Sequence, residues 1–352
     1  MIVLNYGTDI VKTTYDTLAA SDILEFLKKG MNVAVKPNLV VPRPAYDGAT
    51  THTEVVEGII RFFNDFGISN IRIIESAWVG DSTKMAFQVC GYEELSRKYN
   101  VPLIDLKSDS CTKLKYKDLS IAICNEALNT DFLINVPVLK AHCQTRLTCC
   151  MKNLKGCIPD NEKRRFHTLG LDKPIAVLNA LLKPGYNVID GICGDLSFEE
   201  GGNPVVSNRI LVGRDSMLLD SYCAELIGYA PDDIGYLAYA NKIGLGEYFT
   251  QKSELIELNA SDKPAYVPNS RRPSDKYGEY INEDAACSAC FSSLVRALHR
   301  SPKLRGRGKI CIGQGFKGKT GEGIGVGNCA RGFDKFVPGC PPKVTDIMKL
   351  LS

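Results

Sequence analysis

A length of 352 residues exceeds what one ordinary hydrophobic core needs and suggests two or three domains. An apolar content of 44% and a charged content of 24% are typical of a globular protein and exclude a disordered one. Because 43 basic residues nearly balance 40 acidic ones, no strong field for nucleic acid is expected. With neither a signal-peptide pattern nor an apolar run of about 20 residues, we expect a cytoplasmic chain without a membrane span.

The first part of the chain alternates predicted strands and helices. Residues 32–36 form a short apolar run that ends at a proline, as expected of a buried strand. A helix is predicted from the capping-box pattern at Thr51–Glu54, with apolar residues at helical spacing as far as Gly67. The strand expected at 70–75 completes a βαβ unit, so the two strands should pair in parallel. A further strand is predicted at 101–106.

A second series of the same kind begins near Asp131. Its first strand is expected at 132–136 and again ends at a proline. Further elements follow from helical periodicity and from short apolar runs. Helices are predicted at 173–182, 217–227 and 234–243, and strands at 186–190 and 209–212. Two α/β lobes with a mainly parallel sheet are therefore expected, covering residues 1–125 and 126–262. The sequence leaves open whether they share one sheet.

The composition changes at about residue 263, where proline, serine and basic residues dominate through Lys276 and predict a linker. Beyond it the sequence predicts a helix at Cys287–His299, a glycine-rich loop, and a last helix from about Lys343. Residues 263–352 are therefore expected to form a linker and a small, irregular, cysteine-rich domain. The predicted fold class is α/β, with two βαβ-type lobes followed by this domain.

Fourteen cysteines in a chain expected to be cytoplasmic point to metal or redox chemistry, because disulfides are disfavoured in that compartment. Cys287 and Cys290 lie one turn apart at the start of a predicted helix, so both thiolates can reach one metal centre. Cys340 stands before Pro341, an order that recurs at iron–sulfur sites. Together with Cys329 from the glycine-rich loop, these residues predict one iron–sulfur cluster of the [4Fe-4S] type.

Other interpretations of the cysteines stay open. The same four residues could form a structural zinc site, and Cys311 is a spare ligand. Between Cys143 and Cys157 lie two adjacent cysteines, Cys149 and Cys150, which on a helix should point about 100° apart and not share a second cluster. Reactive thiols are the alternative there. Five more are interpreted as small buried apolar residues: Cys90, Cys111, Cys124, Cys193 and Cys223.

Several motifs resemble those of the DUF362 family, an uncharacterised family in which some members carry iron–sulfur clusters. These motifs are Val35–Val40, Thr51–Val56, Ile134–His142, Met151–Pro159 and Val188–Ile192. The resemblance implies a fold and a cofactor. It implies no reaction, because the family has no settled activity.

Polar side chains follow three of the predicted strands, which is where open parallel sheets bind ligands. Lys36 and Asn38 follow the first of these strands. Lys140 and His142 follow the second, and Asp190 follows the third. Lysines with amide and imidazole donors suit a carboxylate or a phosphate, so we expect a pocket for a small anionic metabolite. The next segment supplies three residues that are expected to close over it: Lys152, Asn153 and Lys155.

Three functions fit these features. The first is an iron–sulfur oxidoreductase acting on the anionic metabolite, with Lys36, Lys140 and His142 as catalytic residues and the others binding substrate. The second is a non-catalytic electron-transfer or cluster-carrying protein that docks a redox partner protein. The third is a non-redox enzyme whose cluster or zinc is structural. Plain alternatives are a solvated strand end for each lysine and a hydrogen-bonded structural role for His142.

Overall fold

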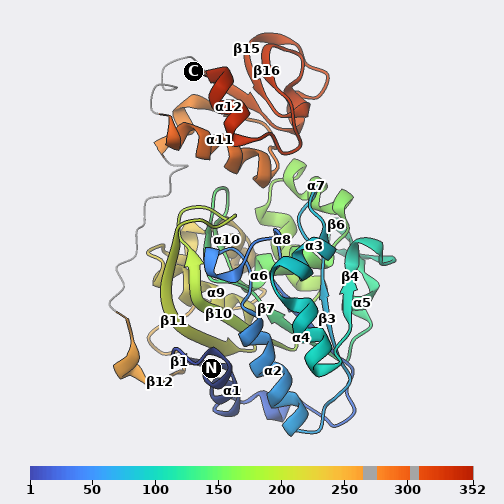
Figure 1. The fold of residues 1–352 in the computed structure, drawn as a ribbon, viewed down its shortest axis with the longest axis vertical. Coiled ribbons are helices and arrows are strands. Elements are labelled where there is room, and N and C mark those ends of the chain that lie inside the picture. Colours follow the sequence, from blue (N-terminus) through green and yellow to red (C-terminus); the bar gives the residue numbers. More distant parts are fainter. Residues whose placement is uncertain (265–275, 302–308, 352) are drawn as a thin grey trace.

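The computed structural model describes residues 1–264, 276–301 and 309–351. Eight strands form one sheet in the order β12–β1–β11–β10–β7–β2–β3–β4 (Figure 1). Their bounds are β1 Ile2–Tyr6, β2 Val33–Pro37, β3 Ile71–Glu75, β4 Leu103–Asp105, β7 Phe132–Val136, β10 Tyr186–Asp195, β11 Pro204–Gly213 and β12 Leu255–Leu258. Neighbours pair in parallel except at β1–β11 and β10–β11. The predicted α/β class with a mainly parallel sheet is confirmed, and strands from both expected lobes share one sheet.

Helices cover both faces of the sheet (Figure 1). They are α1 Ile10–Ala19, α2 Thr53–Asp65, α3 Thr83–Val89, α4 Tyr92–Tyr99, α5 Asn125–Leu128, α6 Cys150–Asn153, α7 Asp160–Thr168, α8 Asp172–Leu181, α9 Ser216–Leu226 and α10 Gly235–Lys242. Alternate strand residues point to opposite faces, so Val33 and Val35 pack with α1 and α2, whereas Ala34 packs with α8 and α9. Burial of both faces explains why the strands are apolar runs.

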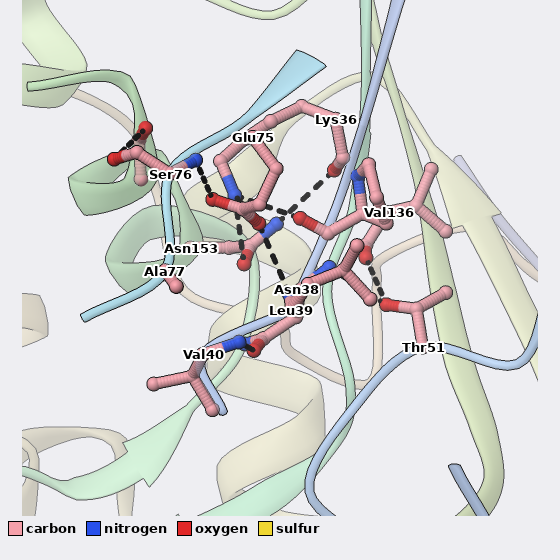
Figure 2. A network of polar contacts seen from close by, with 12 residues as sticks. Lys36, Asn38, Leu39, Val40, Thr51, Glu75, Ser76, Ala77, Val136 and Asn153 are labelled. Carbon is pink, nitrogen blue, oxygen red and sulfur yellow. Dashed lines mark hydrogen bonds and ion pairs between the residues drawn. The ribbon is translucent and has the colours of Figure 1, made fainter. Parts of the chain in front are cut away.

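The helix predicted after β2 is present, but its N-terminal cap differs from the prediction. α2 follows His52, and no side chain caps it. Thr51 Oγ1 instead accepts a hydrogen bond from Asn38 N at 2.8 Å and donates one to Val136 O at 2.8 Å (Figure 2). The capping-box prediction is therefore wrong, because Thr51 ties the carboxyl ends of β2 and β7 together.

Two short hairpins stand outside the large sheet. β5 (Cys111–Tyr116) pairs with β6 (Leu119–Cys124), and β8 (Lys140–His142) pairs with β9 (Arg146–Thr148); both pairs are antiparallel. Within the residues that the structure describes, no helix combines the length and the apolar character needed to span a membrane.

The C-terminal region is organised around an apolar cluster that also includes Cys143 and Phe198 from the preceding α/β part. A parallel sheet has the order β13 (Ile281–Glu283), β14 (Ile310–Ile312), β15 (Gly321–Val326) and β16 (Phe333–Val337). α11 (Ser288–Arg300) and α12 (Val344–Leu351) pack together. Both helices were predicted, but the expected glycine-rich loop is wrong over β14–β16. Most of the expected linker, at 265–275, lies outside the described residues.

The C-terminal unit sits over the carboxyl ends of the central strands, beside α7 (Figure 1). Gln144 Nε2 donates to Ala286 O at 2.9 Å, and Ser288 Oγ donates to Gln144 Oε1 at 2.7 Å. Arg296 Nη2 donates to Gly201 O at 2.6 Å. These contacts bring the start of α11 against the part of the sheet where the polar residues gather.

Candidate functional site

A pocket opens at the carboxyl ends of β2 and β3, beside β8 and beneath the start of α11. It encloses about 790 Å³ of space between atoms, its mouth included. Seven of the eight side chains predicted for the site line it: Lys36, Asn38, Lys140, His142, Lys152, Asn153 and Lys155. The eighth, Asp190, lies elsewhere. The strand-end argument thus brings together residues that are more than 100 positions apart in the chain.

A buried ion pair forms one wall of the pocket (Figure 2). Lys36 Nζ lies 2.7 Å from Glu75 Oε2 and also donates to Pro37 O at 2.7 Å. The Glu75 carboxylate accepts further hydrogen bonds from Leu39 N at 3.1 Å and from Ser76 N at 2.7 Å. Both charges are therefore compensated within the chain, as burial requires.

Three asparagine side chains extend this network into the sheet. Asn153 Nδ2 donates to Lys36 O at 3.3 Å and to Asn135 Oδ1 at 2.8 Å. Asn135 Nδ2 in turn donates to Asn187 Oδ1 at 2.9 Å. These bonds fix α6, which carries Lys152, against β7 and β10.

The remaining lysines differ in how many hydrogen-bond partners the chain provides for their ammonium groups. Lys140 Nζ is buried and donates to Ala49 O at 2.5 Å and to Glu199 O at 2.8 Å. Lys152 Nζ donates to a threonine hydroxyl at 3.3 Å. Within the described residues Lys155 makes no hydrogen bond or ion pair, and its ammonium faces the Phe166 ring at 5.9 Å. Desolvation lowers the pKa of Lys140 and of Lys155 to about 7.

His142 is held as a hydrogen-bond donor. Its Nδ1 accepts from Gln144 N and from Thr145 N, each at 3.1 Å, so the ring proton lies on Nε2, which contacts the Glu199 carboxylate. Desolvation lowers the pKa of His142 to about 3 and keeps the ring neutral. Burial alone would raise the pKa of Glu199, but His142 and the lysines outweigh it and lower that pKa to about 2. Glu199 therefore balances only part of the lysine charge.

Two groups of described side chains could bind a metal ion, since each brings three ligand atoms within 4.8 Å of one another. They are His142 with Cys143 and Glu199, and Cys149 with Cys150 and Asp220. In the first group the proton on His142 Nε2 lies between the ring and the Glu199 carboxylate, and a metal ion bound there would have to displace this proton. In the second, the carboxylate accepts from Cys150 N at 2.7 Å and from Met151 N at 3.0 Å. The sulfurs of Cys149 and Cys150 are 3.9 Å apart, so the predicted divergence is wrong, because Cys149 precedes α6 and its backbone is not helical.

The four C-terminal cysteines converge from three places in the chain. Cys287 precedes α11 and Cys290 lies in its first turn, Cys329 follows β15, and Cys340 follows β16. Cys290 donates a hydrogen bond that lowers the pKa of Cys340 to about 6. Cys287 lies within electrostatic reach of Cys329 and Cys340. The four cysteines thus lie in one neighbourhood, and their role as a ligand set stays a prediction.

The surroundings of this site fit a negatively charged metal cluster. Gly327 has φ +85°, and a Cβ atom there would lie 3.8 Å from Cys290 Sγ and 3.5 Å from Gly339 O. Burial raises the pKa of Cys329, and the cations Lys317 and Arg164 oppose that rise. The same two cations contribute to the lowered pKa of Cys340. A glycine cradle and nearby cations are what four thiolate ligands require.

The cysteine site is connected to the pocket through one of its members. Cys287 lines the pocket together with the lysines, and so does Arg164. Cys340, in contrast, is exposed to solvent. The site thus has one side toward the pocket and another toward the outside.

Asp190 has a structural environment. Its Oδ2 accepts from His52 N and faces His52 Nδ1, both at 2.8 Å, and its Oδ1 accepts from Ile192 N at 3.1 Å. The sequence placed Asp190 at a strand end, but β10 runs on to Asp195, so Asp190 is buried in mid-strand.

Several lining residues escaped the sequence analysis. Glu75 is the last residue of β3, and the strand-end argument applied there would have found it. Trp78 and His167 carry no signal of their own. The charged and aromatic lining residues that were not predicted are Glu75, Trp78, Lys163, Arg164, His167 and Glu199.

Known proteins share parts of this chain. The "Thylakoid-associated protein sll1697" of Synechocystis sp. is 25% identical over 236 residues, which cover 62% of this chain and 70% of that protein. The structure of the lactate racemase apoprotein from Thermoanaerobacterium thermosaccharolyticum matches with a TM-score of 0.44 and 12% identity, over 64% of this chain and 57% of that one. A protein from Thermotoga maritima matches with a TM-score of 0.40 and 12% identity, over 67% and 60%. The chain thus spans less than two thirds of either solved structure.

A family model described as a domain of unknown function, DUF362, matches residues 33–225. The match contains all five motifs on which the resemblance was based, and every lining residue from Lys36 to Glu199. It ends before the four C-terminal cysteines. Because it covers more than half of the 352 residues, the chain belongs to the DUF362 family.

Proposed function

We propose that the chain is an iron–sulfur oxidoreductase that acts on a small anionic metabolite bound in the pocket. The observation that carries the proposal is the position of Cys287, which belongs to the four-cysteine site and also lines the lysine-rich pocket. A [4Fe-4S] cluster, held by Cys287, Cys290, Cys329 and Cys340, would supply one-electron transfer beside the substrate.

The residues of the pocket divide the remaining tasks among them. Lys155, which makes no hydrogen bond or ion pair with the described residues, and Lys152 bind the anion. Lys140, whose pKa lies at about 7, holds or releases a proton at neutral pH. Lys36 and His142 are engaged with Glu75 and Glu199, and they fix the charges around the substrate. Trp78, Val40 and Val79 provide an apolar wall, so the ligand combines an anionic group with an apolar part.

A second candidate function is an electron-transfer protein that docks a redox partner. The exposure of Cys340 favours it, because a cluster held there would lie near the surface. Both functions require the cluster, but they differ in the role of the pocket. An oxidoreductase binds a small anion there, whereas a carrier has no use for the lysines.

Trp78 permits a direct test, because it is the sole tryptophan of the chain and it lines the pocket. The anaerobically purified protein is titrated with small carboxylates, sulfate and phosphate, and tryptophan emission is recorded. A saturable change with one anion, followed by bleaching or recovery of the cluster absorbance on adding that anion, supports the oxidoreductase. Saturable binding of oxidisable or reducible carboxylates without any change in cluster absorbance would contradict it, whereas sulfate and phosphate report binding alone.

A further inference from the structure

Two cysteines outside the pocket face each other across the β5–β6 hairpin. Cys111 begins β5, Cys124 ends β6, and the two residues are partners in the antiparallel register. Their sulfur atoms are 3.8 Å apart. Cys111 is exposed, so its interpretation as a small buried residue is wrong, whereas Cys124 is buried as expected. One thiol is therefore open to a reagent and the other lies directly behind it.

The backbone around this pair suits a cross-strand disulfide. Asn125 N donates to Ser110 O at 2.9 Å, and these residues are the neighbouring pair in the same register. Hydrogen-bonded and non-hydrogen-bonded pairs alternate along an antiparallel ladder. Cys111 and Cys124 are thus a non-hydrogen-bonded pair, for which the Cα atoms lie about 4.5 Å apart. Disulfides span Cα separations of about 4.4–6.8 Å, so side-chain rotation suffices to close the bond.

We propose that Cys111 and Cys124 form a thiol–disulfide site that reacts with small disulfides of the glutathione type. The Cys111 thiolate attacks one sulfur of the small disulfide, which gives a mixed disulfide and releases one small thiol. Cys124 then loses its proton, attacks Cys111 Sγ and releases the second small thiol. The protein gives up two electrons and two protons, and the small disulfide takes up both. No metal and no pocket residue takes part.

The site adjoins a segment that shapes the pocket. Cys124 Sγ approaches Leu106 O at 3.6 Å. The next residue, Lys107, donates from Nζ to Trp78 O at 3.0 Å and to Asp81 O at 2.7 Å. When the disulfide closes, Cys124 loses its thiol hydrogen and can no longer donate to Leu106 O. Leu106 precedes Lys107, whose hydrogen bonds hold the segment that contains Trp78.

The test uses the full chain, with oxidised glutathione as the only oxidant. The protein is incubated anaerobically at about pH 8.5, where a larger share of the thiols is ionised, then alkylated and digested with trypsin. The tryptic peptides 108–113 and 118–140 each contain one cysteine, Cys111 or Cys124. Disulfide formation joins the two peptides into one species, about 2 Da lighter than their sum. The buried pair Cys149 and Cys150, with sulfurs 3.9 Å apart, serves as the internal comparison.

Variants separate the two steps of the reaction. We expect joined peptides in the wild type, a lasting glutathione adduct on Cys111 in Cys124→Ser, and no reaction of Cys124 in Cys111→Ser. The Cys149–Cys150 pair should stay reduced throughout. A wild-type chain that keeps a glutathione adduct on Cys111 without joining the peptides would overturn the proposal, as would joining that is seen only after denaturation.

Discussion

Lys36 Nζ lies 2.7 Å from Glu75 Oε2, and the two side chains are 1% and 3% exposed. Lys36 is the next-to-last residue of β2 and Glu75 the last of β3, and these strands are parallel neighbours, so the sheet itself sets their separation. Because Glu75 neutralises Lys36, the positive charge that remains for a ligand comes from Lys140 on β8 and from Lys152 and Lys155 on and after α6. The pair thus forms a neutralised part of the pocket wall, whereas Lys155 makes no hydrogen bond or ion pair with the residues that the structure describes.

Removing one partner of this pair should destabilise the fold strongly. In Glu75→Gln the buried ammonium of Lys36 loses its counter-charge, which should cost about 3–5 kcal/mol of unfolding free energy. Urea unfolding measures the loss. The exposed pair of Lys12 and Asp16 offers a matched control, since Asp16→Asn should cost no more than about 0.5 kcal/mol. An equal loss of unfolding free energy in the two variants would contradict the role given to the buried pair of Lys36 and Glu75.

Replacement of Lys155 should weaken anion binding without unfolding the chain. Lys155→Met removes a charge-assisted contact of about 1.5–3 kcal/mol, which corresponds to roughly a 10- to 100-fold rise in Kd. Titration monitored by Trp78 emission measures this change. Lys242→Met removes an exposed charge from α10 and should leave Kd unchanged. An unchanged Kd in Lys155→Met would exclude Lys155 from the binding site.

Anion affinity should fall as pH rises through about 7. In the folded chain Lys155 and Lys140, with pKa values lowered to about 7, are charged below that pH and neutral above it. An anion binds the charged form, so Kd should rise up to about tenfold per pH unit for each proton taken up on binding. Sulfate is a suitable probe between about pH 6 and 9, because its own charge is constant there. Lys155→Met should flatten the profile; a flat wild-type profile would contradict the assignment.

Asp190 should matter for stability and not for binding. Asp190→Asn removes a buried carboxylate that accepts from His52 and from Ile192, and we expect a loss of about 1.5–3 kcal/mol in urea unfolding. The Kd for the anion should stay within about twofold of the wild-type value, because Asp190 does not line the pocket. A large rise in Kd with unchanged stability would return Asp190 to the binding residues.

Much of the fold was predictable from short apolar runs. The segments at 32–36, 70–75 and 132–136 are buried on both faces, and the two that end at prolines show where their strands stop. Strand ends located four pocket residues, Lys36, Asn38, Lys140 and His142, and the segment after His142 supplied the other three. The predictions failed where tertiary contacts decide: Thr51 bonds to β7 and not to its own helix, and β10 continues past Asp190 without any local signal.

Two other features could not be predicted from a local sequence pattern. Glu199 lies in a loop with turn composition, and it reaches the pocket because Asp195 accepts hydrogen bonds from Ser197 N and Phe198 N and folds the loop back. β15 contains three glycines, which lower strand propensity, and it forms because Ile324 and Val326 join the C-terminal apolar cluster. Both outcomes depend on partners distant in sequence.

The most direct measurement is iron and sulfide analysis of anaerobically purified protein, made on the wild type, Cys290→Ser and Cys311→Ser. The account predicts about four iron atoms and four sulfides per wild-type chain, a value that Cys311→Ser keeps and Cys290→Ser loses. Cys311, whose sulfur accepts from Asn282 Nδ2 at 3.5 Å, is the matched control from the same unit. One zinc per chain without sulfide, or equal metal content in all three proteins, would contradict the cluster and with it the proposed oxidoreductase.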